Sequence, residues 1–563
     1  MRWLTLAILG VTAMATTAGC SRTKAPQATE PNILVGPRFW TGDPARPWAD
    51  ALVLSEGRIV ALASKAEIPK LIAGGGSVRE LPGVVAVPGL VDAHGHLAGY
   101  ALARRRVDLA GTTSLEQALD RVEKFAAAHP DDRWIQGRGW DQNAWPDHAW
   151  PDADRLEQIV PGRPCALWRV DGHALWVNRT ALAAAGIGPA TKDPSGGAIH
   201  RDSDGRPTGI LVDNAAELVA AKIPAPSAKE LRAALEAAAP ELLALGLTGV
   251  HAMDVDGKEW DALEALAREG RFPLRVTAYA KLESDLHRRL LAQGPLVSGR
   301  LRAAGVKLYA DGALGSRGAR LLAPYDDARG VKGLWIVPPK KLEEQVAAVL
   351  AAHLQPAVHA IGDAANREVL DAFAAAERRD PSSRDLRPRV EHAQILDRAD
   401  IPRFARLGAI ASMQPTHATS DMPWVEDRLG SARLAGAYAW RSLASSGARL
   451  AFGSDFPIES PDPRLGLYAA TTRQDLRGAP SGGWLPAQRL TLVEALAAFT
   501  QGAAYAGRDE ENVGLLAPGK WCDVTVFGVD IFNAPPRDLA EAPIAATVIG
   551  GQVFFQRQAA PPR

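Results

Sequence analysis

Residues 226–254 read PSAKELRAALEAAAPELLALGLTGVHAMD and contain one complete helix–strand unit. Ser227 and Glu230 have the spacing of a capping box, which marks the start of a helix. The amphipathic run that follows predicts a helix ending at Gly246, and the apolar residues 248–253 then predict a strand. A helix that leads directly into a short buried strand is the repeating unit of a parallel α/β sheet.

The same order recurs along most of the chain, and eight apolar segments qualify as parallel strands. In chain order they are GVVAVPGLVDAHGH (83–96), LTGVHAMD (247–254), LRVTAYA (274–280), AGVKLYADG (304–312), PAVHAIGD (356–363), PRVEHAQ (388–394), GAIASMQP (408–415) and ARLAFGSD (448–455). This number of units predicts an α/β fold with a (β/α)8 TIM-like barrel over residues 87–507. The active site of such a barrel lies at the carboxyl ends of its strands.

The composition limits the classes of partner. The chain has 563 residues, is 47% hydrophobic, and carries 64 Lys and Arg against 64 Asp and Glu. It can therefore bury a large core, and it has no charge excess that would favour nucleic acid, so we expect a small-molecule substrate and no nucleic-acid partner. The three cysteines, Cys20, Cys165 and Cys522, are too far apart to indicate a disulfide framework or a thiolate zinc cluster. The sequence does not determine the oligomeric state.

Two β-rich segments flank the predicted barrel. Residues 51–64, ALVLSEGRIVALAS, predict a hairpin, and residues 519–530 and 544–557 have the same β character. We expect residues 32–86 and 508–556 to pair into one small β-sandwich. Between the first two barrel strands, residues 134–213 predict an insertion that is rich in tryptophan and glycine, and we interpret it as a lid or pocket wall.

The N-terminus resembles an export signal. Arg2 precedes an apolar stretch, and small residues precede Cys20, the pattern of a bacterial lipoprotein signal. We therefore expect a signal peptide over residues 1–19, a tether over 20–31, and a lipid anchor at Cys20 on the periplasmic face of the outer membrane. Thr17 stands where an aliphatic residue is usual, so a non-lipidated signal and an uncleaved anchor remain alternatives. The apolar stretch is shorter than the roughly 20 residues that span a bilayer.

Polar side chains gather at the ends of several predicted strands. His94 and His96 are two residues apart at the end of the first strand, so their side chains share a face. His359, His392 and Asp455 each close a different strand. Any one of these residues alone is better explained as structural. Because the carboxyl ends of barrel strands meet at one face, the set as a whole predicts a divalent-metal centre.

These motifs resemble those of the amidohydrolase superfamily, and within it the amidohydrolase-3 (YtcJ-like) branch. The carrying motifs are PGLVDAHGHL, GWDQNAWP, VDGHALWVNRTAL, KLYADGALGSRGA, HAIGD, RVEHAQ, FGSDFP and GKWCDVTVF, and they span the chain after the signal. The resemblance implies a metal-dependent hydrolase with one or two divalent ions, most simply Zn²⁺. It implies that the metal ligands are His94, His96, His359, His392 and Asp455.

Lys307 and three further residues also receive candidate roles. Lys307 lies in an apolar strand, where a buried ammonium group is costly without a partner. An ion pair with Asp311 or a side chain that reaches solvent would explain it, whereas the resemblance implies a carboxylated lysine that bridges two metal ions. Three residues are candidates for substrate contact: His173, Trp140 and Arg317. Arg317 has the alternative role of holding its glycine-rich loop.

The leading functional prediction is hydrolysis of a C–N bond, in an amide or related carboxamide. Asp455 would take a proton from the attacking water and pass it to the leaving nitrogen. Two alternatives stay open. The same barrel could hydrolyse an ester, lactone or cyclic amide, or deaminate a ring carbon. A catalytically inactive, lipid-anchored solute-binding protein is the alternative outside the enzymes, since a fold does not dictate a function.

Overall fold

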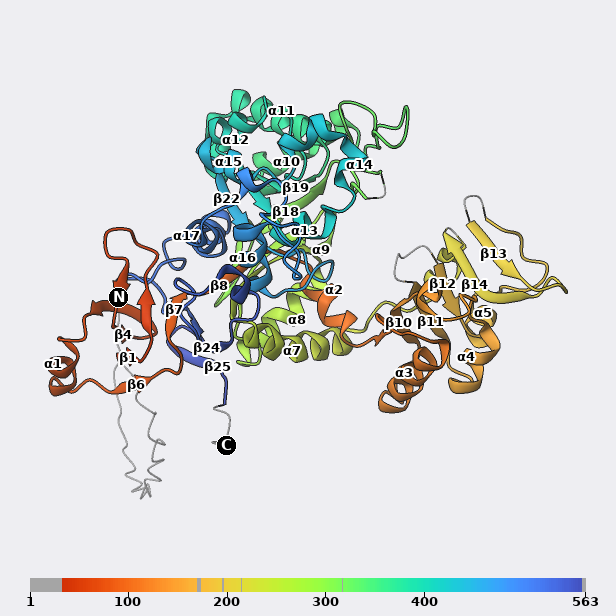
Figure 1. Cartoon of the computed structure of the whole chain (residues 1–563), viewed down its shortest axis with the longest axis horizontal. Helices are drawn as coiled ribbons and strands as arrows, with labels where there is room; N and C mark the ends of the chain where they lie inside the picture. Colours follow the sequence, from red (N-terminus) through yellow and green to blue (C-terminus); the bar gives the residue numbers. More distant parts are fainter. Residues whose placement is uncertain (1–32, 170–173, 195–196, 214, 316, 559–563) are drawn as a thin grey trace, which may run out of the picture.

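The computed structural model describes residues 33–169, 174–194, 197–213, 215–315 and 317–558 (Figure 1). The predicted signal peptide, the tether with Cys20, and His173 lie outside these residues. Among the described residues, none of the helices combines the length and the apolar character of a membrane-spanning segment.

Eight parallel strands form the central sheet, hydrogen-bonded in chain order. They are β8 (Leu90–Gly95), β15 (Leu247–Val255), β16 (Arg275–Lys281), β18 (Leu301–Tyr309), β19 (Gln355–Ala360), β20 (Arg389–His392), β21 (Ile410–Met413) and β22 (Arg449–Phe452). A parallel bridge between Gly95 and Phe456 brings the last strand back to the first. Each strand overlaps one of the eight predicted segments, and the result is a nearly closed TIM-like barrel.

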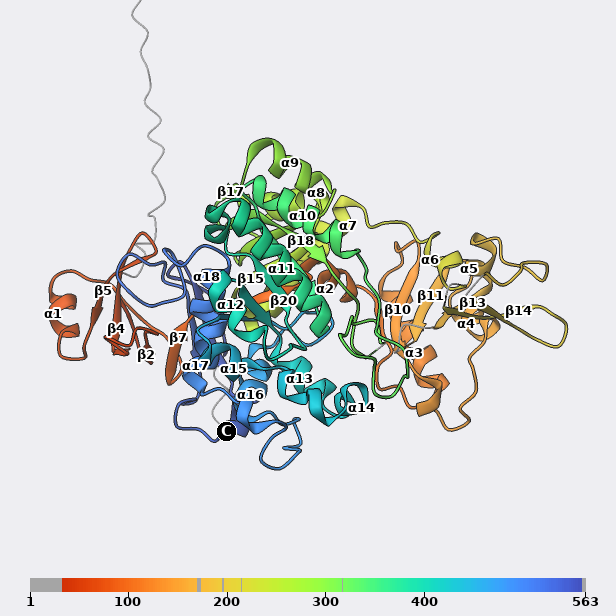
Figure 2. The same ribbon diagram turned by 90° about the horizontal axis from the view of Figure 1, so that it is seen from above.

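Helices surround this sheet, as Figures 1 and 2 show. They include α7 (Ala228–Ala244), α8 (Gly257–Arg268), α9 (Asp285–Gln293), α10 (Pro339–Ala351), α11 (Asp363–Arg379), α12 (Ile401–Leu407), α15 (Trp440–Ser445), α16 (Pro463–Thr472) and α17 (Leu492–Ala497). The capping box predicted for α7 is present, with both reciprocal hydrogen bonds between Ser227 and Glu230. The helix buries Leu231, Leu235 and Leu242 against the sheet, and this burial positions β15 directly after it.

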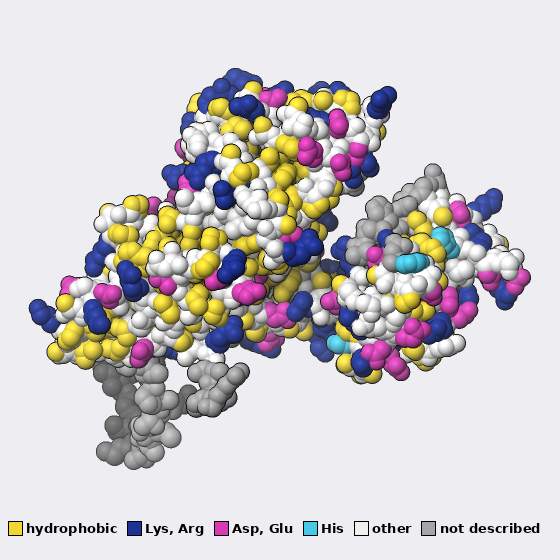
Figure 3. All heavy atoms as spheres, in the orientation of Figure 1, with side chains coloured by type: hydrophobic (Ala, Val, Ile, Leu, Met, Phe, Trp, Pro, Cys, Tyr) yellow, Lys and Arg dark blue, Asp and Glu magenta, His cyan; other side chains and the backbone are white. Residues whose placement is uncertain are grey.

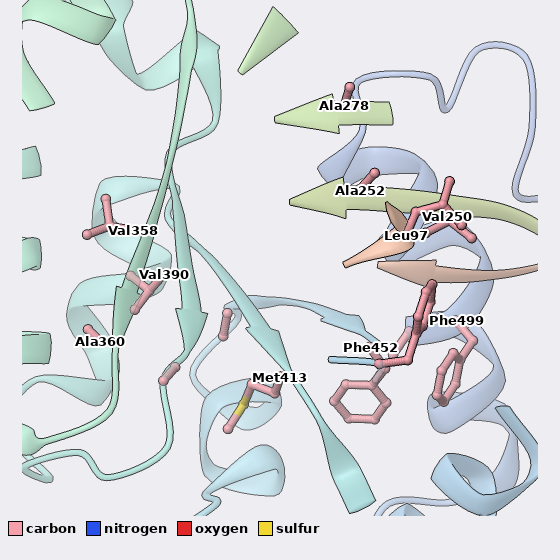
Figure 4. Close-up of a cluster of buried hydrophobic side chains, with 14 of the residues drawn as sticks. Leu97, Val250, Ala252, Ala278, Val358, Ala360, Val390, Met413, Phe452 and Phe499 are labelled. Atoms are coloured by element: carbon pink, nitrogen blue, oxygen red, sulfur yellow. The ribbon is translucent and has the colours of Figure 1, made fainter. Parts of the chain in front are cut away.

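Apolar side chains from the barrel strands belong to one large buried cluster. Val250, Val358, Val390 and Phe452 come from four different strands and are shown in Figure 4 together with Phe499. Because the whole set is removed from water, the hydrophobic effect fixes the relative positions of the strands. The polar residues at the strand ends are therefore held on a rigid frame.

The first predicted strand is divided between two sheets. Its first half is β7 (Val85–Pro88), which pairs with β23 (Val524–Phe527), and its second half is β8 of the barrel. Gly89 lies at the break, where a Cβ atom would come within 2.3 Å of the Thr248 hydroxyl. Only glycine allows the chain to pass this close to β15.

Strands from both ends of the chain share the six-stranded sheet β25-β24-β23-β7-β2-β3, and a four-stranded sheet, β5-β4-β1-β6, lies next to it. The remaining members are β2 (Arg38–Trp40), β3 (Trp48–Ala49), β24 (Ile544–Ile549), β25 (Gln552–Gln556), β1 (Ile33–Val35), β4 (Ala51–Ser55), β5 (Arg58–Ala63) and β6 (Val78–Glu80). Leu34, Leu52, Val524 and Val548 belong to one buried cluster of these two sheets. The sandwich arrangement itself stays a prediction.

The insertion is a separate lobe beside the barrel (Figures 1 and 3). Its sheet has the order β13-β14-β12-β11-β10-β9. The elements are β9 (Val107–Asp108), α3 (Leu115–Ala128), β10 (Ile135–Trp140), α4 (Ala153–Ile159), β11 (Cys165–Arg169), β12 (Ala174–Val177), α5 (Arg179–Ala184), β13 (Gly197–Arg201) and β14 (Pro207–Asp213). The lobe thus begins earlier than the predicted boundary at residue 134, because β9 and α3 pack into it. Its function as a lid or wall stays a prediction.

Candidate metal centre

The carboxyl ends of the barrel strands bring the predicted ligands together. The Nε2 atoms of His94 and His96 lie 3.4 and 3.2 Å from Asp455 Oδ1. The rings of His94 and His392 have centroids 4.8 Å apart, and those of His359 and His392 are 4.6 Å apart. His94, His392 and Asp455 each offer a ligand atom, and these atoms all lie within 4.8 Å of one another. A single divalent cation can therefore contact several of these groups.

Lys307 joins this group from β18. Its side chain is 1% exposed, and its Nζ atom lies 3.4 Å from His94 Nε2. Asp311, the alternative partner, accepts hydrogen bonds from the backbone N–H groups of Arg320, Ile361 and Gly362. Burial lowers the pKa of Lys307, which increases the share of its neutral amine form.

A buried ion pair orients His94. The His94 Nδ1 atom lies 2.6 Å from Glu391 Oε2, and Arg389 donates to Glu391 Oε1 at 2.7 Å. Burial alone would raise the pKa of Glu391, but Arg389 and His94 hold it well below its usual range. Because Nδ1 bonds to a carboxylate, the proton lies on that side and the lone pair of Nε2 faces the cluster. His392 is oriented in the same way, with its Nδ1 atom 2.8 Å from Gln414 Oε1.

Asp92 connects the first barrel strand, β8, to the segment that follows the last strand, β22, through hydrogen bonds. Its carboxylate accepts hydrogen bonds from the His94 N–H at 3.0 Å and from the Ser454 hydroxyl at 2.6 Å. Gly453 lies against this contact, where a Cβ atom would come within 2.4 Å of the His94 nitrogen. The two segments that carry His94 and Asp455 are thus held at a fixed separation.

Several features of the cluster fit a bound cation. His359 Nε2 and Asp455 Oδ1 are buried and have no hydrogen-bond partner among the described residues, since the contacts to Asp455 Oδ1 lack hydrogen-bond geometry. Burial lowers the pKa of His94 to about 4 and that of His359 to about 3, so both rings are neutral, as metal ligands must be. Burial acts to raise the pKa of Asp455, but neighbouring imidazoles bring it down to about 2, which leaves a carboxylate.

The backbone at the centre is strained. His392 and Asp455 have φ angles of 73° and 62°, in the left-handed region of backbone conformation that residues other than glycine rarely adopt. Strain of this kind gathers at functional sites, where the surrounding fold compensates for it. Here it turns two side chains inward at the points where their strands end.

The carboxyl ends of the barrel strands, with the side chains around the candidate ligands, form the barrel mouth. Four residues in or next to it are absent from the sequence prediction. Arg389 and Glu391 form the ion pair inside β20, and His417 lies on α13 (Pro415–Asp421) with its Nε2 atom 3.8 Å from Asp455 Oδ2. Asp254 Oδ2 accepts from the Tyr309 hydroxyl and lies 3.8 Å from His96 Nδ1. His417 follows a predicted strand by two residues, so its position at the catalytic end of the barrel was a usable signal.

A pocket of about 510 Å³ opens beside His96, at the ends of β15, β16 and β18. Its lining residues are Ala98, Leu102, Pro226, Leu231, Asp254, Asp256, Glu259, Lys281 and Tyr309. One part of the lining is apolar, and the other part offers carboxyl groups and one ammonium group. Burial raises the pKa of Glu259 to about 8, so this carboxyl is largely protonated at neutral pH.

Two of the three predicted substrate residues can be examined in the structure, and both have other partners. His173 lies outside the described residues. The Trp140 side chain has no exposed surface, because its indole N–H donates to the Leu167 carbonyl at 2.7 Å and its ring packs near Trp145 and Trp176 inside the insertion. The substrate contact predicted for Trp140 is therefore wrong for this structure. Arg317 forms a bidentate ion pair with Asp327, which matches the alternative of a loop-holding residue.

Comparison with known proteins gives one consistent family. The chain matches the Amidohydrolase family over residues 78–555. It is 35% identical to YtcJ of Bacillus subtilis (strain 168) over 484 residues. This alignment covers 85% of this chain and 90% of that protein. It is 26% identical over 546 residues to an N-substituted formamide deformylase of Arthrobacter pascens, covering 93% of this chain and 98% of that enzyme.

A solved structure gives the same result. The uncharacterized metal-dependent hydrolase from Pyrococcus horikoshii OT3 superimposes with a TM-score of 0.76 at 28% identity, over 90% of this chain and 98% of that one. These relatives support hydrolysis as the class of reaction, and they confirm the resemblance to the amidohydrolase-3 (YtcJ-like) branch. With a family match over most of its length and a relative at 35% identity, this chain belongs to the amidohydrolase family.

Proposed function

We propose that this protein is a metal-dependent hydrolase that cleaves a C–N bond in an amide or related carboxamide. The observation that carries the proposal is the cluster of imidazoles around one carboxylate at the barrel mouth, in which buried polar atoms of His359 and Asp455 have no hydrogen-bond partner within the described part of the chain. Such atoms are rare in native proteins unless a ligand completes them. Membership in the amidohydrolase family supports hydrolysis as the class of reaction.

The donor set suits a divalent ion, most simply Zn²⁺, with one or two ions per chain. The residues that would hold it are His94, His96, Lys307, His359, His392 and Asp455. Neutral imidazole and carboxylate donors are the ligands that zinc takes in catalytic sites. When bound, such an ion supplies a Lewis acid and lowers the pKa of water to about 7, so that a nucleophile is available at neutral pH.

Lys307 has the environment of a lysine that reacts with carbon dioxide. Its burial favours the neutral amine, the form that attacks CO₂. Attack forms an N–C bond and releases one proton, which turns a buried cation into a carbamate anion. The change removes the cost of an unpaired ammonium group and adds oxygen ligands between the imidazoles. The position of Nζ, 3.4 Å from His94 Nε2, supports this assignment.

Asp455 is the proton carrier in this proposal. Its Oδ1 atom faces the imidazoles of His94 and His96, and its Oδ2 atom faces His417. The carboxylate takes a proton from the attacking water and delivers it to the nitrogen of the breaking C–N bond. The amine then leaves as a neutral group, and the acid product keeps the oxygen of the water.

The pocket beside His96 is the place for the amine part of the substrate. Its apolar residues, among them Leu102 and Leu231, suit an alkyl or aryl group. The relative from Arthrobacter pascens is an N-substituted formamide deformylase, so N-substituted formamides are the first compounds to test. Hydrolysis of such a compound gives formate and a primary amine.

The test is a panel assay with the zinc-loaded full-length protein, supplied with bicarbonate. We expect 4-nitroformanilide to release 4-nitroaniline, with the rate abolished by a chelator and restored by zinc. The panel includes 4-nitrophenyl acetate, γ-butyrolactone and cytosine. Turnover of the ester, lactone or ring amine alone would favour the alternative chemistry on the same barrel. Tight binding of small molecules without turnover would favour the solute-binding alternative.

We also propose that the protein is exported and anchored by lipid at Cys20, on the periplasmic face of the outer membrane. The support is the N-terminal pattern of Arg2, an apolar stretch and small residues before Cys20. Cell fractionation of the wild type and of Cys20→Ala tests it. The wild type is expected with the membranes and the variant in the soluble fraction. A variant that still sediments with membranes would contradict the anchor.

A further inference from the structure

His417 lies beside Asp455 at the barrel mouth and has no role in the function proposed above. Its side chain is 12% exposed, and its Nε2 atom is buried without a hydrogen-bond partner among the described residues. Most buried polar side-chain atoms in native proteins have a hydrogen-bond partner. An open imidazole nitrogen next to the candidate metal ligands therefore points to a role in binding at the site.

Two neighbours define where that nitrogen points. The ring of His417 lies nearly parallel to that of His392, with 13° between the planes and 6.0 Å between the centroids. Nε2 lies 3.8 Å from Asp455 Oδ2, whereas Asp455 Oδ1 faces His94. His417 thus stands at the side of Asp455 that is turned away from the candidate ligands, at the edge of the reaction site.

The helix that carries His417 is held at both ends. Gln414, which precedes α13, accepts a hydrogen bond through Oε1 from His392 Nδ1 at 2.8 Å. Asp421, the last residue of α13, accepts hydrogen bonds from the Tyr438 hydroxyl and from Gln394 Nε2. The position of His417 is fixed before any substrate binds, which is the condition for a preorganised hydrogen-bond donor.

A role as a further metal ligand fits less well. The atoms of His94, His392 and Asp455 come within 4.8 Å of one another, and His417 is outside this set among the described residues. Its nitrogen approaches the far oxygen of Asp455 and is therefore displaced from the shared centre. This arrangement suits a group that contacts the substrate.

We propose that His417 donates a hydrogen bond from Nε2 to the oxygen of the scissile carbonyl and stabilises the negative charge that develops there. The inference rests on the proposed function and narrows it to acyl compounds, because deamination at a ring carbon offers no such carbonyl oxygen. A fixed donor aimed at a developing oxyanion typically contributes about 10²–10³-fold to kcat. His417 is thus a catalytic residue beside Asp455.

The test compares two variants in the zinc-loaded full-length protein. His417→Phe keeps a ring against His392 but removes the donor, whereas His417→Gln keeps an N–H at a similar reach. With 4-nitroformanilide, we expect kcat to fall about 100-fold or more in His417→Phe with little change in KM, and to stay within about tenfold in His417→Gln. His129→Phe, in the insertion, is the matched control and is expected to match the wild type.

A binding measurement separates this inference from the choice of substrate. Methylphosphonate has the tetrahedral shape and negative oxygens of the proposed transition state, and calorimetry gives its Kd without turnover. We expect binding to His417→Phe to be about tenfold or more weaker, and binding to His417→Gln to be close to that of the wild type. If the wild type binds methylphosphonate but cleaves no amide, the proposed function fails while the role of His417 is still decided.

Two results would overturn the inference. Equal kcat and equal methylphosphonate affinity in His417→Phe and wild type would show that the donor is not used. Loss of zinc from His417→Phe, measured by elemental mass spectrometry, would make His417 a ligand. The expected result is an unchanged zinc content in both variants.

Discussion

The barrel mouth and the core of the insertion are both rich in ring side chains that carry polar atoms, but they treat those atoms differently. At the mouth, His359 Nε2, His417 Nε2 and Asp455 Oδ1 are buried and have no hydrogen-bond partner among the described residues. In the insertion, the indole N–H groups of Trp140 and Trp176 donate to backbone carbonyls at 2.7 and 2.8 Å, and only that of Trp145 is without a partner among the three. Several open polar atoms around one carboxylate indicate a ligand site, whereas a single open atom in an apolar core does not.

The two regions also differ in how much they destabilise the folded protein. The mouth holds His392 and Asp455 in left-handed backbone conformations and keeps Glu259 in a buried position that raises its pKa. The insertion core is mostly apolar, with residues such as Leu156 and Leu167 removed from water. Proteins accept local instability where activity needs it, so the mouth is expected to gain stability when its polar groups are replaced.

The largest effect is expected from Asp455→Asn. The amide keeps the shape of the side chain but cannot carry the proton, and general acid–base catalysis contributes about 10²–10⁴-fold. We expect kcat to fall by a factor in this range with the fold intact, as measured with the amide panel and by circular dichroism. Near-full turnover with metal still bound would remove Asp455 from the mechanism and weaken the contrast between the two regions.

Trp140→Ala tests the insertion side of the comparison. Removing a fully buried tryptophan typically costs about 3–5 kcal/mol, and the loss is expected in the stability of the insertion. Limited proteolysis should cut the insertion faster, while zinc content and kcat stay near the wild-type values. Trp150→Ala, at a tryptophan with 43% exposure in the same lobe, is the control and should change little. A loss of substrate affinity with the insertion still folded would restore Trp140 as a substrate contact.

Glu259→Gln tests the cost of a buried carboxyl at the mouth. Its pKa is raised from 4.5 to about 8 in the folded protein, so the folded state binds the proton more tightly than the unfolded state. The stability that this group contributes is complete below pH 4.5 and is lost as the pH rises through 8. The variant should therefore be more stable than the wild type at pH 8, by an amount of the order of a few kcal/mol, and similar to it at pH 4.5.

Urea denaturation at the two pH values measures this difference. A constant difference between Glu259→Gln and wild type at both values would mean that Glu259 titrates like a solvent-exposed carboxyl. In that event, the buried carboxyl of Glu259 would destabilise the folded protein less than we infer from its burial.

The smallest effect is expected from Arg317→Ala. The Arg317 side chain is 38% exposed, and its ion pair with Asp327 is worth less than about 1 kcal/mol at such a site. We expect little change in the free energy of unfolding and none in kcat. A KM that rises more than about tenfold for an amide bearing a carboxylate, but not for 4-nitroformanilide, would show that Arg317 binds substrate.

The barrel was predictable because its strands are short apolar runs and most of them follow a helix. The strand-end histidines were visible for the same reason, since His359 and His392 directly follow β character in the sequence. Arg389 and Glu391 were not singled out, because their charges compensate each other in a buried ion pair of 2.7 Å that only the structure shows. His417 lies two residues beyond the predicted segment 408–415, at the start of a helix, so a rule limited to the last residues of each strand missed it although its position was a usable signal.

The insertion was less predictable than the barrel. Its first strand, Val107–Asp108, is two residues long and has no pattern of its own, so the boundary was placed too late. Trp140 was interpreted as a pocket residue because tryptophans are frequent in binding sites. Only the three-dimensional packing shows that its N–H is bonded to Leu167 and that its ring is enclosed.

The most direct test of the account is the metal content of the full-length protein, measured by elemental mass spectrometry after purification without chelator and with bicarbonate present. We predict about two zinc ions per chain, the number expected if Lys307 is carboxylated and serves as a ligand together with the histidines. His94→Ala is the matched variant and is expected to retain fewer. A wild-type protein that holds no metal, even after zinc is added back, would contradict the metal-dependent hydrolase.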